Sequence, residues 1–378
     1  MLFLRVFFTH SGRSMDLALH DSLRTHAIEH VRDGMARRRL DALIVSDLSV
    51  IRWLTGFSGS SGRLLIGTGR CILFTDFRYR EQAAAEVRVA ETVITQDGFA
   101  AELVSGSYPL GSAVGIQSDS MTWNEARRLC EKLQGISMAV PVESFFDDLR
   151  MLKNVIELTH LQRAAAISEQ VLDMVLPMIR PEATELDIAA EISYLHRKLG
   201  AEKDSFDPIV ASGPRGAMPH AKPSAAHFQV GELIVIDMGC VVEGYASDQT
   251  RTVSLGRVSD EAREVYRIVR DAQQLGLDCA RCGMKASELD STVRAFIAGN
   301  GYGEAFGHSL GHGVGIDVHE EPRISSKNDR ILEENMVFTV EPGIYLPGRF
   351  GVRIEDTVVL RSDGAHPFQR FTKQLVEL

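Results

Sequence analysis

Hydrophobic and polar positions along the first 145 residues follow helix and strand spacings in turn. Apolar residues recur at helical intervals in some segments, while short apolar runs bounded by turn residues indicate buried strands. This alternation predicts an α/β fold for the first part of the chain. The predicted elements are a helix at 16–39, a strand at 41–45, a hairpin at 63–74 turning at Gly67-Thr-Gly69, and helices at 79–87 and 122–133.

A different pattern begins near residue 154. Two long amphipathic helices are predicted within 154–200, broken at Arg180-Pro-Glu-Ala-Thr-Glu, where Thr184 starts a capping box. Ser287 is predicted to cap a further helix at 287–299 in the same way. Strand-rich segments follow the first pair of helices and return near the C-terminus, at 206–255 and 336–360. We therefore expect an α+β fold with long helices on one side of a curved antiparallel sheet.

The change of pattern places a domain boundary near 145–155, which gives predicted domains at 1–150 and 151–378. The length of 378 residues is sufficient for two domains with cores of their own. Apolar content of 44% and charged content of 24% are ordinary for a globular protein, and no apolar run is long enough to span a bilayer. The net charge of −10 argues against nucleic-acid binding.

Five scattered cysteines, an odd number, fit a reducing compartment, and we expect a cytoplasmic protein. The first eight residues are apolar but are split by Arg5, and no small-residue cleavage site follows them. This segment therefore does not resemble an export signal. Our hypothesis is that Met15 is the natural start and that residues 1–14 are an upstream extension.

Five residues of the C-terminal half predict a site for two metal ions. Four carboxylates and one imidazole form a hard, oxygen-rich ligand set, which suits Mn, Co, Zn or Mg. The four negative charges balance two divalent cations, and two such ions can hold and ionise a water molecule between them. The predicted ligands are Asp237, Asp248, His312, Glu341 and Glu355.

The spacing of Asp237 and Asp248 predicts that they share one face of a hairpin. If the loop is centred on Val242 and Glu243, the two aspartates lie directly opposite each other on antiparallel strands. Like charges in that position are destabilising unless a cation lies between them. The pair therefore supports the predicted metal site.

Three histidines lie within a glycine-rich stretch next to the predicted ligand set. Glycines allow backbone and ligand to approach closely, and only one of His308, His312 and His319 is required as a ligand. The other two can donate hydrogen bonds to a substrate carbonyl and to the oxyanion that forms from it. Glu341 precedes Pro342-Gly343, a rigid turn, and could act as both ligand and proton shuttle.

These motifs resemble the pita-bread metallopeptidases, the family of Xaa-Pro aminopeptidase and Xaa-Pro dipeptidase, over almost the whole chain. Arg52-Trp-Leu-Thr-Gly-Phe-Ser-Gly-Ser-Ser-Gly and Phe74-Thr-Asp-Phe-Arg-Tyr are similar to the creatinase-like N-terminal domain of these enzymes. Phe206-Asp-Pro-Ile-Val-Ala-Ser-Gly and Pro219-His-Ala-Lys-Pro are similar to their catalytic domain. The resemblance implies an α/β creatinase-like N-terminal domain, which restricts the substrate cleft, and an α+β pita-bread catalytic domain.

The resemblance also implies a role for each site residue. Asp237 would bind one metal, Asp248 and Glu355 would bridge both, and His312 with Glu341 would complete the other. The remaining roles fall on residues around the metals. His308 and His319 would contact the scissile carbonyl, His220 would lie near the substrate pocket, and Arg353 would support the site or reach a substrate carboxylate.

The expected activity is hydrolysis of the bond between an N-terminal residue and proline, with two divalent ions, Mn before Co or Zn. We expect a short peptide substrate, a homodimer, and neither a nucleic-acid nor a membrane partner. Dipeptidase and aminopeptidase remain open alternatives. A creatinase-like amidinohydrolase does not need the five ligands, and non-catalytic binding relatives of this fold typically lose them. All five are present here, which favours the peptidase.

Overall fold

A computed structural model describes residues 10–378 except 106, 107, 109 and 136, with side chains described from residue 17 onward. The chain is divided into two compact units, Met1–Leu149 and Arg150–Leu378. Of the hypothesised upstream extension, residues 1–9 lie outside the described residues. No helix in the described part of the chain has the length and hydrophobicity needed to cross a bilayer.

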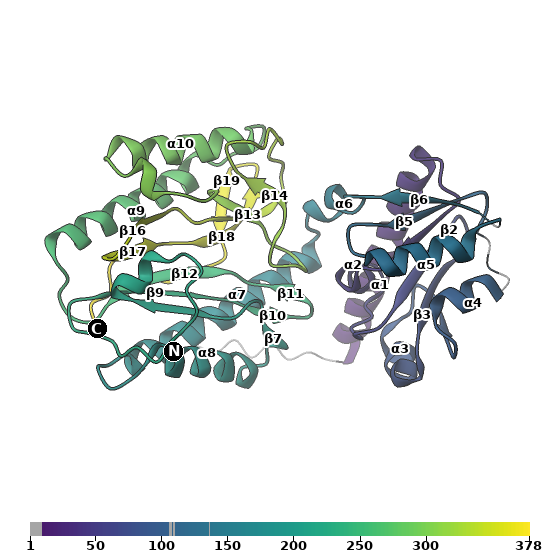
Figure 1. Cartoon of the computed structure of the whole chain (residues 1–378), viewed down its shortest axis with the longest axis horizontal. Helices are drawn as coiled ribbons and strands as arrows, with labels where there is room; N and C mark the ends of the chain where they lie inside the picture. Colours follow the sequence, from purple (N-terminus) through teal and green to yellow (C-terminus); the bar gives the residue numbers. More distant parts are fainter. Residues whose placement is uncertain (1–9, 106–107, 109, 136) are drawn as a thin grey trace. The chain divides into compact units, whose positions relative to one another are not determined.

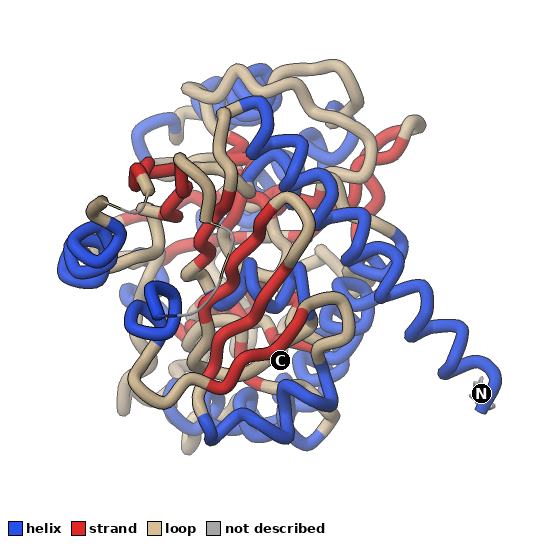
Figure 2. Tube along the Cα trace, turned by 90° about the vertical axis from the view of Figure 1, so that its right-hand side faces the viewer, coloured by secondary structure: helices blue, strands red, loops and turns tan. Residues whose placement is uncertain are grey.

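The unit Met1–Leu149 is built on a six-stranded mixed sheet with the order β4-β3-β2-β1-β5-β6. Figure 2 shows its strands as a twisted layer with helices on either side. The antiparallel pairing of β2 with β3 confirms the predicted hairpin. The strands are β1 Ala42–Val45, β2 Arg63–Gly67, β3 Cys71–Thr75, β4 Glu91–Ile94, β5 Ala113–Gln117 and β6 Met138–Val142.

Helices cover both faces of this sheet, which explains why the residues of its central strand β1 are all apolar. Leu43 and Val45 pack into a core with α1 and α2, whereas Ala42 and Ile44 pack into the core on the opposite face with α4 and α5. The predicted helices at 16–39, 79–87 and 122–133 are confirmed as α1, α3 and α5. The helices of this unit are α1 His10–Arg37, α2 Leu48–Thr55, α3 Arg80–Glu86, α4 Phe99–Ser105, α5 Trp123–Leu133 and α6 Asp147–Met151, which extends past Leu149.

The unit Arg150–Leu378 is a set of small sheets in which every strand pair is antiparallel (Figure 1). The two predicted strand-rich segments are confirmed. The strands are β7 Lys203–Asp204, β8 Ile209–Ser212, β9 Leu233–Met238, β10 Cys240–Val242, β11 Tyr245–Ala246, β12 Gln249–Ser254, β13 Gly311–Gly313, β14 Glu320–Ile324, β15 Val337–Val340, β16 Gly343–Leu346, β17 Phe350–Arg353, β18 Asp356–Arg361 and β19 Gly364–Pro367.

Four long helices of this unit form two pairs, and each pair packs on its own set of strands. The first pair, α7 with α8, contacts β7, β8, β10 and β11, and the second pair, α9 with α10, contacts β14, β15, β16, β17 and β19. Figure 1 shows the second pair along one side of the strands and the first pair along the other. The helices are α7 Val155–Val175, α8 Glu185–Lys198, α9 Asp260–Cys279 and α10 Ala286–Gly299.

One predicted cap is confirmed and the other is wrong. The Thr184 hydroxyl accepts a hydrogen bond from the amide of Asp187, and the Thr184 amide donates to the Asp187 carboxylate, which is a capping box at the start of α8. Ser287 lies inside α10 instead, because that helix begins at Ala286, and the Ser287 hydroxyl bonds Asp329.

The register of the hairpin that carries the two aspartates also differs from the prediction. Glu243 and Gly244 form its turn with φ values of +51° and +88°, a two-residue loop that favours glycine at its second position. The turn is therefore centred one residue later than predicted. Asp237 pairs with Thr250 rather than with Asp248, which precedes β12 by one residue. Asp248 and Thr250 are two positions apart, so Asp248 still falls on the face of Asp237.

Candidate metal centre

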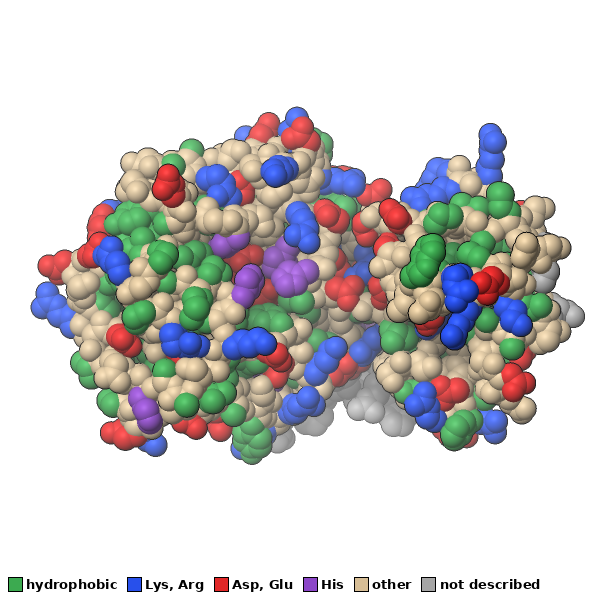
Figure 3. All heavy atoms as spheres, viewed as in Figure 1, with side chains coloured by type: hydrophobic (Ala, Val, Ile, Leu, Met, Phe, Trp, Pro, Cys, Tyr) green, Lys and Arg blue, Asp and Glu red, His purple; other side chains and the backbone are tan. Residues whose placement is uncertain are grey.

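The structure brings all the predicted site residues to one cavity of the Arg150–Leu378 unit, about 410 Å³ in volume. Figure 3 shows histidine side chains gathered at a hollow in this unit, with acidic side chains between them. The residues reach the cavity from separate elements of the chain. Those predicted from the sequence are Asp237 on β9, Asp248 before β12, His312 on β13, Glu341 after β15, Glu355 between β17 and β18, and around them His220, His308, His319 and Arg353.

Backbone pairing places three of the four carboxylates together. Thr250 pairs with Asp237 across the hairpin, and its carbonyl accepts a hydrogen bond from the amide of Glu355 at 3.1 Å. The Thr250 hydroxyl also donates to Glu355 Oε2 at 2.7 Å. The segment that joins β17 to β18 therefore runs beside β12, and Glu355 projects toward Asp237 and Asp248.

Asp248, His312 and Glu355 form the tightest part of the cluster. Each offers one ligand atom, and these atoms all lie within 4.8 Å of one another. His312 Nε2 is 3.5 Å from Asp248 Oδ2 and 3.3 Å from Glu341 Oε1. Donor atoms this close can reach a shared cation without movement of the backbone.

The contacts of the His312 ring show which of its nitrogens carries the proton and which, Nε2, has the lone pair. Nδ1 lies 3.0 Å from the Gly313 carbonyl and so carries the proton, while burial lowers the pKa of the ring to about 4 and keeps it neutral. Without a cation, the lone pair of Nε2 and the two carboxylate oxygens that it faces repel each other. A cation between these atoms would turn the repulsion into three metal–ligand bonds.

The carboxylates show the same need for a cation. Asp237 Oδ1 and Glu355 Oε1 are buried and have no hydrogen-bond partner among the described residues. Burial and mutual repulsion raise the pKa of Asp248 and of Glu355 well above their usual values, and burial raises the pKa of Glu341 to about 8. Unpaired buried carboxylate oxygens beside an imidazole lone pair fit divalent cations, so the chemistry of this donor set agrees with the predicted metal site.

Arg353 lies behind the carboxylates, buried with 4% of its surface exposed. Its Nη2 donates to Asp237 Oδ2 at 2.6 Å, Nε to the Thr250 hydroxyl at 3.0 Å, and Nη1 to the Tyr345 hydroxyl at 2.9 Å. One oxygen of Asp237 is thus neutralised by the guanidinium, and the other is left to a metal. These contacts support the first of the two roles expected for Arg353, that of holding the site.

The three histidines around the cluster differ in how they are held. His308 Nδ1 lies 2.8 Å from the Ser309 carbonyl, and its Nε2 lies 3.0 Å from the Tyr345 hydroxyl, so both ring nitrogens are engaged. His220 and His319 line the cavity without a hydrogen-bond partner in the described part of the chain. His319 packs against the ring of His312 with centroids 4.3 Å apart. The ring nitrogens of His220 and His319 are therefore available to a ligand in the cavity, whereas those of His308 are already bonded.

A buried ion-pair network fixes the loop that carries His319. Glu320, the next residue, is bonded by Arg150 Nη2 and by Lys153 Nζ, each at 2.5 Å, and Arg150 also bonds Asp317 at 2.7 Å. Lys153 is 3% exposed, so this charge is not shared with solvent. Both cations lie at the start of this unit, at residues 150 and 153, and their ion pairs anchor the loop.

Sequence reasoning missed three residues of the site. Thr250 and Tyr345 bond Arg353, and Arg323 lines the cavity and acts to lower the pKa of both His312 and His319. Arg323 lies on β14, four positions after the predicted His319. Because side chains alternate along a strand, this even spacing could have indicated that Arg323 faces the same site. Thr250 and Tyr345 carry no comparable signal. Thr250 bonds Arg353 from 103 positions away, and the contact of Tyr345 with Arg353 depends on the pairing of β16 with β17.

Comparison with known proteins identifies the two units. Residues 159–362 match the model of metallopeptidase family M24, and residues 28–152 match that of the creatinase/prolidase N-terminal domain. The chain is 36% identical to the uncharacterized peptidase YqhT of Bacillus subtilis over 93% of this chain and 99% of that protein. Two solved structures are similar to it along nearly their full length. The Xaa-Pro dipeptidase from Bacillus anthracis has a TM-score of 0.90 at 35% identity, covering 94% of this chain and 100% of that one, and the X-Pro aminopeptidase from Thermotoga maritima has 0.84 at 39% identity, covering 90% and 98%.

The first prediction concerns stability without metal. A carboxyl group whose pKa is raised by folding stabilises the protein below its unfolded pKa and loses that contribution as the pH rises through the folded value. Chelated protein should therefore lose thermal stability between about pH 5 and about pH 8, the pKa of Glu341, and excess Mn²⁺ should restore it. Melting curves with EDTA or Mn²⁺ at several pH values test this. The chelated Glu341→Gln variant, which cannot ionise there, should show a shallower loss, and an equal slope in both proteins would contradict the account.

The second prediction concerns Asp248→Asn. This change removes a buried charge without changing the side-chain shape, so the chelated variant should melt at or above the wild-type temperature while the stabilisation by Mn²⁺ disappears. Isothermal titration of Mn²⁺ and melting curves provide both readouts. Asp260→Asn, on the exposed first turn of α9, is the control and should behave as wild type. Retention of wild-type Mn²⁺ binding by Asp248→Asn would show that the site is placed wrongly.

Proposed function

Because the chain belongs to metallopeptidase family M24 and has a creatinase-like N-terminal domain, we propose that it is a dinuclear metal peptidase that hydrolyses the bond between an N-terminal residue and proline. The observation that carries this proposal is the cluster of Asp248, His312 and Glu355, buried at a cavity of about 410 Å³ with unsatisfied carboxylate oxygens around it. The resemblance drawn from the sequence motifs is confirmed at the level of the family and of both domains.

Two divalent ions, with Mn as the first choice and Co or Zn as alternatives, would be held by Asp237, Asp248, His312, Glu341 and Glu355. When bound, such ions polarise a substrate carbonyl and lower the pKa of a water molecule so that it can attack. The protein's part is to fix the five ligands, which it does through Arg353, Thr250 and the short loops of the hairpins.

The cavity supports a short peptide as substrate. Its volume is at the lower end of the range for small-ligand pockets, and Arg323 and Lys222 provide exposed cations on its wall that suit a peptide carboxylate. An Xaa-Pro bond needs a dedicated site, because proline lacks an N–H and has a fixed φ angle. Solved relatives named as a dipeptidase and as an aminopeptidase are about equally similar to this chain. Whether the protein prefers a dipeptide or a longer peptide must therefore be decided by experiment.

We assign the proton transfers to residues that face the cavity. Glu341, whose Oε1 accepts a hydrogen bond from Thr339 at 3.2 Å, would take the proton from the attacking water and deliver it to the proline nitrogen as the bond breaks. His319 would donate to the carbonyl oxygen as it gains negative charge. His308 would take part only after its ring releases Tyr345, and His220, which lines the same cavity, would contact the substrate.

The two alternatives from the sequence receive less support. A creatinase-like amidinohydrolase does not require the five ligand positions, and a non-catalytic relative would have no reason to bury four carboxylates at one cavity. The buried charges reduce stability in the absence of a bound cation, so their presence together favours a working metal centre.

The third prediction concerns the substrate. Purified protein loaded with Mn²⁺, Co²⁺ or Zn²⁺ should cleave Ala-Pro or Ala-Pro-Ala and should leave Ala-Ala-Ala nearly intact. Initial rates from liberated alanine measure all three peptides. The ratio of Ala-Pro to Ala-Pro-Ala then decides between dipeptidase and aminopeptidase. Faster cleavage of Ala-Ala-Ala than of both proline peptides would overturn the Xaa-Pro assignment and leave a general metalloaminopeptidase.

The fourth prediction concerns His319→Ala. The variant should keep its metals but lose turnover by roughly 100-fold or more, as expected when an oxyanion donor is removed. Metal content by mass spectrometry and kcat on the better proline peptide are the two measurements. Exposed His366 on β19 provides the control, and His366→Ala should match wild type. If His319→Ala lost metal, His319 would be a ligand and the role of His312 would need revision.

A further inference from the structure

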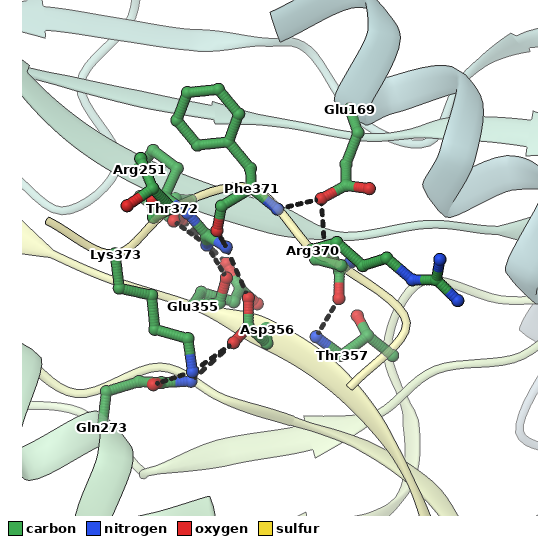
Figure 4. Close-up of polar contacts among 12 residues, drawn as sticks. Glu169, Arg251, Gln273, Glu355, Asp356, Thr357, Arg370, Phe371, Thr372 and Lys373 are labelled. Carbon is green, nitrogen blue, oxygen red and sulfur yellow. Dashed lines mark hydrogen bonds and ion pairs between the residues drawn. The ribbon is translucent and has the colours of Figure 1, made fainter. Parts of the chain in front are cut away.

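The last eleven residues, 368–378, pass next to the backbone of two proposed metal ligands, and Figure 4 shows residues 370–373 of this segment close to Glu355 and Asp356. They begin beside β18, where the amide of Phe368 donates to the Thr357 carbonyl at 3.0 Å. They end beside β12, where the Leu378 amide donates to the Ser254 carbonyl at 2.9 Å. This segment therefore connects β18 with β12, the two strands that begin directly after Glu355 and Asp248.

Gln369 is the first contact of this segment with the centre. Its side chain is buried, with the residue 4% exposed, and it binds the backbone on both sides. Oε1 accepts from the Thr357 amide at 2.9 Å, and Nε2 donates to the Asp248 carbonyl at 2.9 Å. The Thr357 hydroxyl donates to the same carbonyl at 2.8 Å, so the backbone of Asp248 is held by two donors.

Arg251 joins the same segment to Glu355. Its guanidinium, in a residue 2% exposed, donates through Nη1 to the Glu355 carbonyl at 2.5 Å and through Nη2 to Asp356 Oδ1 at 2.7 Å. Nη1 also donates to the Thr250 carbonyl at 3.0 Å. Two further contacts reach the C-terminal segment, from Nη2 to the Phe371 carbonyl at 3.1 Å and from Nε to the Thr372 carbonyl at 3.3 Å.

Lys373 closes this network from the C-terminal side. Its Nζ lies 2.9 Å from Asp356 Oδ2 and 2.8 Å from Gln273 Oε1, while Gln273 Nε2 donates to Asp356 Oδ2 at 3.1 Å. Both oxygens of the fully buried Asp356 are thereby satisfied, and the residue after Glu355 cannot rotate freely. Figure 4 shows the side chains of Arg251, Lys373 and Gln273 converging on this carboxylate, whereas that of Arg370 points away.

We propose that residues 369–373 of this C-terminal segment set the metal affinity of the centre, with Gln369 and Lys373 as positioning residues for Asp248 and Glu355. Neither residue lines the cavity, so neither can contact a substrate or a metal. Both act on the backbone or the neighbour of a carboxylate that is assigned to bridge two ions. The inference rests on the proposed metal centre and adds the part of the chain that holds its shared ligands in place.

A bridging carboxylate must satisfy two ions at once, so it tolerates less movement than a ligand to one ion. Groups that orient metal ligands typically contribute about 10–100-fold to metal affinity. Replacing Gln369 with Met keeps the side-chain length and removes both hydrogen bonds. The Asp248 carbonyl then keeps only Thr357 as a donor, and the carboxylate has more freedom in the absence of metal.

The test is titration of Mn²⁺ into chelator-stripped protein, with the dissociation constant as the main readout. Gln369→Met should bind Mn²⁺ at least roughly 10-fold more weakly than wild type. Its KM for the peptide should be unchanged, and kcat should recover at saturating Mn²⁺. Gln374→Met, an exposed glutamine of the same segment, is the matched control and should bind as wild type. A lower melting temperature of Gln369→Met with an unchanged Mn²⁺ dissociation constant would show a purely structural role and overturn the proposal.

Lys373→Met is the second variant, in case Gln369→Met does not fold. Lys373 is 21% exposed and Asp356 keeps Arg251 as a partner, so the fold should survive while Mn²⁺ affinity falls. Arg370→Met, whose side chain is exposed, is its control. Wild-type protein that binds no Mn²⁺ would refute the proposed centre itself. Normal binding by wild type and by Lys373→Met alike would refute only the positioning role.

Discussion

Four carboxylates packed at one buried cavity are the constraint on which the rest of this catalytic unit depends. Asp237, Asp248, Glu341 and Glu355 repel one another, and burial removes the water that would screen them. Such a cluster is stable only when protons or cations neutralise it. The protein accepts this cost because two divalent ions, once bound, gain from the same concentrated charge. The strands, loops and buried cations around the cavity can be understood as the means of holding these four groups within reach of each other.

Two arginines support the cluster in different ways. Arg353 acts on a ligand side chain, since it neutralises one oxygen of Asp237 and leaves the other available. Arg251 acts on the backbone, since its guanidinium binds the carbonyl of Glu355 and ties it to the C-terminal segment. A planar group with five donors suits both positions, because each must bind several oxygens at fixed angles. Positive charge placed behind the ligands also reduces their repulsion without competing for the metal positions.

Family membership and the cavity constrain function to different degrees. The M24 match and the creatinase-like domain define the chain as a pita-bread metallopeptidase of the Xaa-Pro peptidase family. Under the proposed function, specificity would depend on the walls of the cavity, which Arg323, Lys222 and His220 line in addition to the proposed metal ligands. A cation on the wall favours a short peptide whose carboxylate can reach it, whereas a longer peptide must extend past it. If the proposed function holds, the choice between dipeptide and tripeptide would be decided by a few exposed side chains.

The sequence by itself determined the elements, the fold class and the identity of the candidate ligands. Short apolar runs and helical spacing are local signals, and the ligand motifs are rich in carboxylates and histidines that stand out without any structure. What lay beyond the sequence were contacts that cross between strands. The hairpin register was misjudged by one turn position, because the positive φ angles of Glu243 and Gly244 decide it. Only the tertiary structure decided three contacts: that of His308 with Tyr345, that of Arg353 with Asp237, and that of Gln369 with the Asp248 carbonyl. They join residues 37, 116 and 121 positions apart in the chain, and no local pattern records such pairs.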